Sequence, residues 1–516
     1  MRFRWIAVIL MSTGTLSMSA FLYFFVARNA PGLVRPAIVA LLGVLYGSLY
    51  AVCAVRLITI LAKAGSGKGR QSSLLQRASL AVSLGLLVYL FLASTVTDYY
   101  QPLSLYDEAI AALAAWSSML ILAGLVTVFS RTVGTAAAVR ATVVTILLAL
   151  GTWPLAVALE WINTPQPNVQ LASNRHVFIG GEGGYDTYRI PGIVVLPRDS
   201  RLADGGRQVR ERLVVFAEAR RDAALDNGVV DLVAKTSDDG GASWSRQTVI
   251  CQNLQQGRHG KCGNPTPVFD ANSGTLILAF NKSGTGLHGT EQGGDLLPSR
   301  AGGQSWGEER LITSDNFVFG PGKGLQKTSA PNAGRLLIPG HVNGEATILY
   351  SDDGGAYWLR GEGVAGGDET DLAELPDGRL YMATRHRAPL SRAPEPNGRQ
   401  FSLSSDAGVN WSPASVDTAL PTPVCQASVL AYEGGLLFAN PAHHRSRVAM
   451  TIRHSPDAGQ TWPISIPVYP GPSGYSVLAS DGEGDVLLLY ENGDMAYSDR
   501  ISLARIPASI LQGDRM

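Results

Sequence analysis

Hydrophobic residues follow two different patterns along this chain, and the change falls near residue 160. Before it lie five long apolar runs, near 5–27, 37–55, 78–97, 109–130 and 141–159. A helix that crosses about 30 Å of hydrocarbon needs about 20 apolar residues. Residues 1–160 are therefore predicted to be an α-helical membrane domain of five spans. The first run is too long, and too plainly followed by others, to be only a cleaved signal peptide.

From about residue 170 onward the apolar runs are short and alternate with polar residues, with Gly, Asp, Asn and Pro between them. Examples are 212–218, 275–280, 335–339 and 485–490. Short runs that are bounded by turn residues are typical of β-strands. Residues 176–516 are thus predicted to be an all-β domain, and a Pro-containing linker over 161–175 joins it to the membrane domain.

A repeat of eight residues gives the β domain its period. The pattern Ser-x-Asp-x-Gly-x-x-Trp occurs four times and ends at Trp244, Trp358, Trp411 and Trp462. A fifth copy, which ends at Trp306, has Ala301 in place of the Asp. The Ser and Asp can bond backbone N–H groups of a turn, the Gly permits a positive φ, and the Trp packs the hairpin onto its sheet. The spacing of about 50–60 residues corresponds to one propeller blade, so we expect six blades and a structural role for the repeat.

Basic residues decide the predicted orientation of the spans. Residues 1–160 hold eleven Lys and Arg against four Asp and Glu, and since the whole chain has 42 of each, the β domain is acidic. With the N-terminus inside, the inner basic residues are Arg2, Arg4, Lys63, Lys68, Arg70, Arg77, Arg131 and Arg140, and the outer ones are Arg28 and Arg35. This bias predicts an integral protein of a bacterial inner membrane, with a cytoplasmic N-terminus and a periplasmic or extracellular β domain. The lipid bilayer is an expected partner, whereas the β domain lacks a basic face for nucleic acid.

The four cysteines are compatible with an oxidising exterior. Cys53 lies in a predicted span and Cys425 in an apolar run that resembles a strand, which leaves Cys251 and Cys262 as the pair that could form a bridge. The ten residues between them permit a disulfide without requiring it. The sequence has no CxxC, HExxH or EF-hand pattern, so neither a metal site nor a cofactor is expected.

Motifs outside the repeat resemble those of a known family. They are Tyr188-Arg189-Ile190-Pro191, Phe216-Ala217-Glu218-Ala219-Arg220 and Gly263-Asn264-Pro265-Thr266-Pro267. Together with the repeats, which that family calls Asp-boxes, they resemble the exo-α-sialidase (neuraminidase) family from about residue 176 to 505. The resemblance implies a six-bladed β-propeller, a retaining exo-sialidase that hydrolyses terminal α-linked sialic acid, and sialylated glycans as its substrates.

Sialic acid carries a carboxylate on its anomeric carbon, and guanidinium groups bind such an anion with paired hydrogen bonds that Lys cannot supply. The residues that the resemblance assigns to substrate binding are Arg189, Arg385, Arg447 and Arg220, with Glu491 as the acidic partner of the first. For the third arginine, the family's spacing to the later Tyr favours Arg447 over Arg445. Any one of these arginines could form an ordinary salt bridge, but three at matching positions favour a carboxylate site.

The acid/base residue that matches the family is Asp226. It lies on a polar loop before the strand that leads into the first Asp-box. A carboxyl group there could protonate the leaving oxygen and later activate water. Asp222 and Asp231 are alternatives by composition, although Asp231 is expected to begin the strand.

Tyr475 matches the family's nucleophile. A neutral phenol avoids the repulsion that an attacking carboxylate would meet beside the carboxylate of the substrate, and sialidases are a known exception to the two-carboxylate rule. Because a phenol has a pKa of about 10, it needs a base. Glu369 is the predicted base, and Glu374 is its nearest alternative. If both residues lie on one regular strand, their side chains point to opposite faces of the sheet.

Two other functions are compatible with the sequence. A catalytically silent sialic-acid-binding propeller would keep the arginines but lose Asp226, Glu369 or Tyr475, and all three are present. A membrane sensor or a module associated with a transporter is suggested by five spans where one would anchor the domain, but the spans hold few charges for an ion path. Turnover by purified residues 165–516 would separate the enzyme from both.

Overall fold

The computed structural model describes residues 173–511 with several gaps. The described ranges are 173–208, 210–221, 228–252, 254–255, 258–283, 293–313, 316–386, 398–443, 447–494 and 496–511. The chain divides after Thr164 into two compact parts, and all of these ranges belong to the second part. The predicted membrane domain, its orientation and most of the linker lie outside these ranges, so they and the domain bounds stay predictions. No helix among the described residues is long and apolar enough to cross a membrane.

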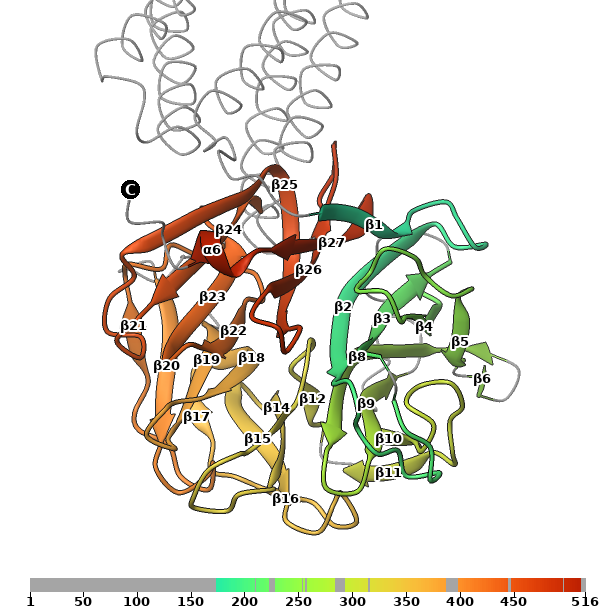
Figure 1. The fold of residues 1–516 in the computed structure, drawn as a ribbon, viewed down its shortest axis with the longest axis horizontal. Coiled ribbons are helices and arrows are strands. Elements are labelled where there is room, and N and C mark those ends of the chain that lie inside the picture. The colour runs from blue at the N-terminus through green and yellow to red at the C-terminus, as the bar shows by residue number, and fades with distance from the viewer. Residues whose placement is uncertain are drawn as a thin grey trace, which may run out of the picture. The chain divides into compact units, whose positions relative to one another are not determined.

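The described residues are all-β apart from one short helix, α6 (Ala508–Leu511), as the sequence predicted. The strands form sheets of seven, eight, six and four strands and a two-stranded hairpin (Figure 1). We divide the four larger sheets into six antiparallel groups, here called units 1 to 6 in chain order, by separating the eight-stranded sheet between β4 and β8 and the seven-stranded sheet within β25. Unit 1 contains β2 (Thr187–Leu196), β3 (Arg212–Arg220), β4 (Val230–Ser237) and β5 (Thr248–Cys251). Unit 2 contains β8 (Lys261–Asp270), β9 (Thr275–Ser283), β10 (Gly293–Ser299) and β11 (Arg310–Thr313). Unit 3 contains β12 (Val318–Phe319), β13 (Leu325–Gln326), β14 (Leu336–Val342), β15 (Glu345–Ser351), β16 (Leu359–Arg360) and β17 (Val364–Ala365).

The second half of the domain continues this order. Unit 4 contains β18 (Gly367–Glu374), β19 (Leu380–His386), β20 (Arg399–Ser404) and β21 (Ser415–Asp417). Unit 5 contains β22 (Ser428–Tyr432), β23 (Gly435–Pro441), β24 (Val448–Ser455) and the first part of β25 (Ile464–Ser480). Unit 6 contains the rest of β25, β26 (Val486–Asn492), β27 (Arg500–Ile506) and β1 (Ser173–Ile179). A small hairpin of β6 (Leu254–Gln255) and β7 (Arg258–His259) lies between units 1 and 2 along the chain.

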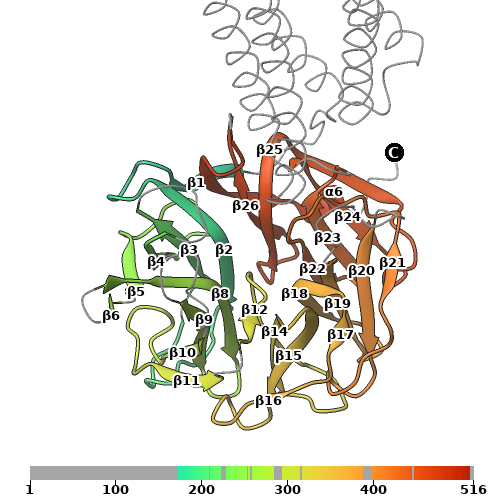
Figure 2. The same ribbon diagram turned by 180° about the vertical axis from the view of Figure 1, so that it is seen from behind.

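The units follow one another around a centre, so the sheet curls back on itself (Figure 2). Strand β2 contacts β8 and β25, β14 contacts β8 and β18, and β22 contacts β18 and β25. Strand β1 pairs with β27, so the first described strand completes the last unit. This pairing joins the two ends of the described chain in one unit.

Six clusters of buried apolar side chains fill the six interfaces between neighbouring units. Strand β3 shows how one strand serves two interfaces. Its Leu213 and Val215 pack toward unit 6, whereas Val214 and Phe216 pack toward unit 2. All nine residues of β3 are buried. Such a strand is apolar on both sides because each of its faces meets another apolar face.

The repeated eight-residue pattern has the structural role that we expected. In the first copy, Ser237 Oγ donates to Asp239 Oδ1 at 2.7 Å and accepts from the backbone N of Gly241 at 2.9 Å. Gly241 has a φ of 87°, and Trp244 packs against the cluster between units 1 and 6. The same Ser and Asp contacts recur in the other three complete copies. These turns follow β4, β15, β20 and β24 and belong to the scaffold.

The structure settles the cysteine assignments. Cys251 at the end of β5 and Cys262 in β8 form a disulfide with a Cα–Cα distance of 6.1 Å, and this bridge links units 1 and 2. Cys425 is a buried free cysteine. It precedes β22 and does not lie on a strand, so the expectation from its apolar surroundings is wrong. Those surroundings are apolar because the segment is buried in the centre, next to Ile190 and Tyr475.

Candidate active site

One edge of the curled sheet carries the residues that the sequence singled out. In an antiparallel unit, the first and third strands start at the edge where the second strand ends. Arg189, Glu369 and Tyr475 lie near the starts of the inner strand segments in units 1, 4 and 6. The ends of second strands carry Arg220, Arg385 and Glu491, and Arg447 directly precedes the third strand β24. All of them therefore share one edge, here called the site edge.

The inner strands are irregular at the site edge. The register shifts between Arg189 and Gly192 in β2, between Gly367 and Thr370 in β18, and between Ser473 and Ser476 in β25. A bulge bends the strand and re-aims its side chains. Ala449, beside Arg447, has a φ of 61° at a further irregularity, a conformation that is uncommon outside glycine.

Arg189 and Glu491 form a buried ion pair at the centre of this edge. Arg189 Nε and Nη2 donate to the two Glu491 oxygens at 3.0 and 3.2 Å. The same carboxylate accepts from the backbone N of Ile190 at 2.8 Å and of Tyr475 at 3.0 Å. A Cβ at Gly474 would lie 2.2 Å from Glu491 Oε2, so only glycine lets the chain pass here. The carboxylate thus fixes both the arginine and the backbone that carries Tyr475.

Glu369 connects Tyr475 to Arg385. The Tyr475 hydroxyl donates to Glu369 Oε1, and Arg385 Nη1 donates to Glu369 Oε2 at 2.8 Å. Burial alone would raise the pKa of the Glu369 carboxyl, but the charge of Arg385 and the two hydrogen bonds hold that pKa below its usual value. Burial, and then the charge of Glu369, raise the pKa of the Tyr475 phenol well above its usual value. The pair therefore rests as a carboxylate beside a neutral phenol.

Arg447 is fully buried beside Tyr475. Its Nη2 donates to the Val424 carbonyl at 3.0 Å, while its Nε and Nη1 have no hydrogen-bond partner among the described residues. Arg385 Nε likewise has none. Buried donors of a charged group are costly to leave unsatisfied. These N–H groups are suited to an anion that enters the site.

The ring of Tyr475 lies between charged groups. The guanidinium carbon of Arg189 lies 5.2 Å from the ring centroid, and that of Arg447 lies 5.4 Å from it. Arg385 reaches the hydroxyl end of the same residue through Glu369. The three predicted arginines are thus gathered around Tyr475, and Arg445 lies outside the described residues.

Arg220 is engaged with another carboxylate. Its Nη2 donates to Glu218 Oε2 at 2.6 Å, and Glu218 also pairs with Lys261 at 3.2 Å and accepts from the backbone N of Asn264 at 3.0 Å. Glu218 and Arg220 are both buried. This network fixes the site edge where units 1 and 2 meet, and a direct role of Arg220 in substrate binding stays a prediction.

The predicted acid/base residue, Asp226, and its alternative Asp222 lie outside the described residues. Asp231, the other alternative, lies in β4, in line with the expectation that it begins the strand. It accepts from Tyr185 Oη at 2.7 Å, Arg221 Nη2 at 2.5 Å and Gln252 Nε2 at 3.0 Å. All three donors reach Oδ2, so this side chain is engaged in contacts within the scaffold.

Glu374, the alternative to Glu369, lies at the other end of β18. Its carboxylate accepts from Lys327 Nζ at 2.9 Å and from backbone and hydroxyl groups of Thr328 and Ser329. Burial acts to raise the pKa of Glu374, but these hydrogen bonds lower it to about 2. Glu374 therefore anchors the segment 327–329, whereas Glu369 meets Tyr475.

Three residues at the site did not emerge from the sequence. Tyr497 lies 5.1 Å from the Arg189 guanidinium carbon and 4.8 Å from that of Arg447, measured to its ring centroid. Arg399 is buried and donates to the Cys425 carbonyl at 3.0 Å, and burial lowers its pKa to about 10. Cys425 itself packs with Tyr475, and burial raises the pKa of its thiol. None of the three stands in a repeated motif, so sequence spacing offered no signal for them.

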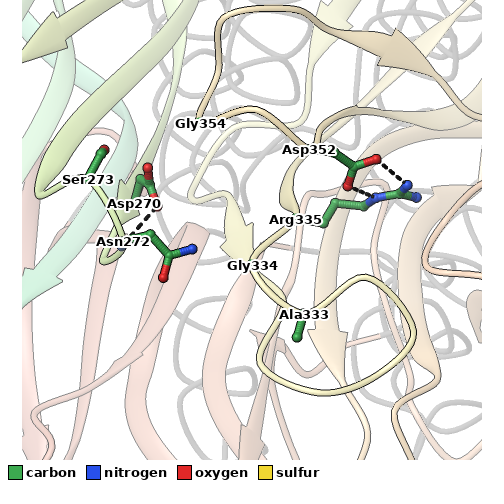
Figure 3. A pocket seen from close by; sticks show the side chains of 8 residues that line it. All are labelled: Asp270, Asn272, Ser273, Ala333, Gly334, Arg335, Asp352 and Gly354. Atoms are coloured by element: carbon green, nitrogen blue, oxygen red, sulfur yellow. Dashed lines mark hydrogen bonds and ion pairs between the residues drawn. The ribbon is translucent and has the colours of Figure 1, made fainter.

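A cleft at the opposite edge carries different groups (Figure 3). It is lined by Asp270, Asn272, Ser273, Ala333, Gly334, Arg335, Asp352 and Gly354. Asp270 ends β8 and Gly354 belongs to an Asp-box turn, which places the cleft away from the site edge. Arg335 is occupied there by Asp352 at 2.8 and 2.6 Å. Within the described ranges, no group of three or more His, Cys, Asp or Glu could hold a metal ion.

Comparisons with known proteins agree with this arrangement. The BNR repeat-like domain family matches residues 211–500. The chain is 30% identical to a sialidase of Micromonospora viridifaciens over 66% of this chain and 55% of that protein. It is 29% identical to an exo-alpha-sialidase of Aspergillus fumigatus over 53% of this chain and 69% of that one. The chain thus spans about half the length of the Micromonospora protein and about two thirds of the Aspergillus protein.

Solved structures show the same fold. The Hadza microbial sialidase Hz136 has a TM-score of 0.56 at 24% identity, over 66% of this chain and 69% of that chain. An intramolecular trans-sialidase from Ruminococcus gnavus has a TM-score of 0.53 at 17% identity, over 65% of this chain and 98% of that chain. The family match covers more than half of the sequence, so the chain belongs to the BNR repeat-like domain family, and these solved structures share its fold.

Proposed function

We propose that the chain is a retaining exo-α-sialidase that hydrolyses terminal α-linked sialic acid from glycoconjugates. The observation that carries this proposal is the Glu369–Tyr475 pair with three arginines around it. The names of the curated relatives support it. On this proposal the six units are the blades of a six-bladed sialidase-like propeller, with sialylated glycans as the partners of its site edge.

The substrate carboxylate binds Arg189, Arg385 and Arg447 in this account. Arg447 and Arg385 contribute buried N–H groups that have no acceptor among the described residues. Arg189 is held by Glu491, so it meets the ligand without reorganising. An anion that satisfies these donors removes an existing cost as it binds. Preorganised donors of this kind also stabilise charge that develops during the reaction.

The chemical steps follow from the resting states of Glu369 and Tyr475. Glu369 takes the phenolic proton while the Tyr475 oxygen forms a bond to the anomeric carbon and the glycosidic bond breaks. Asp226 gives a proton to the leaving oxygen. In the second step Asp226 takes a proton from water, the water oxygen attacks the anomeric carbon, and Tyr475 leaves and regains its proton from Glu369. Two displacements at one carbon retain its configuration.

The test is turnover by the purified full-length chain in detergent. The substrate is a fluorogenic aryl α-sialoside, and Tyr432→Phe is the control, since the Tyr432 hydroxyl donates to Gly484 O, on the turn between β25 and β26. We expect the wild type and Tyr432→Phe to release the fluorophore and Tyr475→Phe to lose most of this activity. A wild-type chain that binds sialosides without hydrolysing them would instead support the silent binding propeller.

We also propose that the chain is an integral protein of a bacterial inner membrane, with its N-terminus in the cytoplasm and its β domain outside. The five apolar runs and the excess of inner Lys and Arg support this orientation. The Cys251–Cys262 disulfide fits an oxidising compartment. Protease added to intact spheroplasts should release an active fragment by cleavage within 165–173. A β domain that stays protected until the membrane is dissolved would contradict the orientation.

A further inference from the structure

Two of the three arginines share a second aromatic neighbour. The guanidinium carbons of Arg189 and Arg447 lie 5.1 and 4.8 Å from the ring centroid of Tyr497. They lie 5.2 and 5.4 Å from the ring centroid of Tyr475. Each cation therefore contacts both rings, and each ring contacts both cations. Two like charges are held close together in a buried setting, which is unfavourable unless other groups compensate them.

The positive charges of Arg189 and Arg447 are compensated by different groups. Arg189 has the two oxygens of Glu491. Arg447 is completely buried, and among the described residues its side chain donates only to the Val424 carbonyl. The negative face of an aromatic ring attracts a cation within about 6 Å of the ring centroid, and more strongly where water is excluded. For Arg447, the two tyrosine rings therefore supply attraction that a carboxylate supplies for Arg189.

The turn that carries Tyr497 is well anchored. Asp499 accepts from the backbone N of Ala496 through its carboxylate at 3.1 Å and donates its own N to the Ala496 carbonyl at 3.1 Å. The Asp499 carbonyl accepts from Gly180 N at 2.9 Å. A Cβ at Gly474 would come within 3.0 Å of the Tyr497 ring. The absence of a side chain at Gly474 thus leaves room for this ring beside the nucleophile.

We propose that Tyr497 is a positioning residue of the carboxylate site, and that its ring face holds Arg189 and Arg447 at the spacing at which both donate to one carboxylate. The proposal rests on the proposed sialidase function. It assigns the effect to the ring and none to the Tyr497 hydroxyl. Tyr475 cannot take over this task, because its position is set by its reaction with the substrate.

The proposal is tested with the full-length chain and two ligands, a 2-deoxy analogue of sialic acid and its uncharged methyl ester. Tyr497→Phe keeps the ring and should bind the acid within about twofold of wild type. Tyr497→Leu removes two cation–π contacts and should weaken binding of the acid by about tenfold, in the range that such contacts reach when desolvated. Binding of the ester should weaken much less. The KM of Tyr497→Leu should rise with little change in kcat, and Tyr357→Leu, at a tyrosine that is 68% exposed, is the matched control.

Four results would overturn the proposal. Wild-type affinity in Tyr497→Leu would show that the ring is dispensable, and an equal loss in Tyr497→Phe would assign the effect to the hydroxyl. Equal losses for acid and ester would indicate a general change of shape. If Tyr497→Leu does not fold, Tyr497→Trp is measured instead. The proposal predicts that Tyr497→Trp keeps wild-type affinity for the acid, and a tenfold loss of that affinity would refute the proposal. Failure of the sialidase function itself would be recognised earlier, because the wild type would then neither bind the acid nor turn over a sialoside.

Discussion

Replacement of Glu491 by Gln tests the buried centre of the site. Four donors converge on this carboxylate: Arg189 Nε, Arg189 Nη2, and the backbone N of Ile190 and of Tyr475. A Gln keeps the volume but presents one carbonyl oxygen and one NH2 group, so it cannot accept from all four. The variant also leaves the Arg189 guanidinium buried without its counter-charge. We expect both lower stability and a displaced Tyr475.

The magnitude follows from the burial of both partners, whose side chains are 4% and 0% exposed. Breaking a buried ion pair by neutralising one partner costs about 3–5 kcal/mol. In a domain of this size that corresponds to a fall in melting temperature of roughly 4–8 °C. Because the Tyr475 backbone N loses its acceptor as well, kcat/KM should fall by about hundredfold, or about 2.8 kcal/mol of transition-state stabilisation.

The assay is thermal unfolding of the full-length chain in detergent, followed by tryptophan fluorescence, together with turnover of an aryl α-sialoside. Glu362→Gln is the control, since Glu362 is exposed. We expect the control to match the wild type in both measurements. An unchanged melting temperature and an unchanged kcat/KM in Glu491→Gln would refute the reasoning that this carboxylate organises the site.

Three further predictions concern individual groups. Asp226→Ala should reduce hydrolysis of poor leaving groups far more than of activated aryl ones in steady-state kinetics, and equal losses would remove it as the acid. In calorimetry, Arg447→Ala should weaken binding of the 2-deoxy acid by about 2–5 kcal/mol, and Arg445→Ala should weaken it much less. A larger loss in Arg445→Ala than in Arg447→Ala would exchange the roles of the two arginines. Glu374→Gln should lower the melting temperature at pH 7. The folded pKa of Glu374 is about 2 and its unfolded value about 4.3, so its stabilisation is complete above about pH 4.3 and lost as the pH falls through about 2. A difference in melting temperature between the variant and the wild type that does not shrink between pH 7 and pH 3 would contradict this prediction.

The strands and turns of the β domain were largely predictable because they depend on local sequence. The Ser, Asp and Gly of each Asp-box contact one another within a few residues, so their spacing carries the turn. The burial of whole strands was not predictable from alternation. Neighbouring residues of β3 face two different units that are both apolar, and only the closed arrangement of units supplies both faces.

The site divides in the same way. Arg189, Arg385, Glu369 and Tyr475 stand in motifs that resemble those of sialidases, and the structure brings them together although Tyr475 and Glu369 are 106 residues apart. From the sequence we preferred Glu369 to Glu374, and the different partners of the two carboxylates now supply a physical reason for that preference. Tyr497 acts through a ring face that contacts two arginines distant in sequence. No pattern along the chain marks such a contact.

The central claim is that Tyr475 attacks the anomeric carbon, and covalent trapping tests it most directly. A sialosyl fluoride with a second fluorine on C3 slows both chemical steps, because the fluorine destabilises positive charge at the anomeric carbon, while the fluoride leaves readily enough for the intermediate to accumulate. Digestion of the trapped full-length chain and mass spectrometry of its peptides should locate the fluorosialyl group on Tyr475 and find none in Tyr475→Phe. A label on Glu369 or on any other residue, or turnover of the reagent without a labelled peptide, would contradict the mechanism.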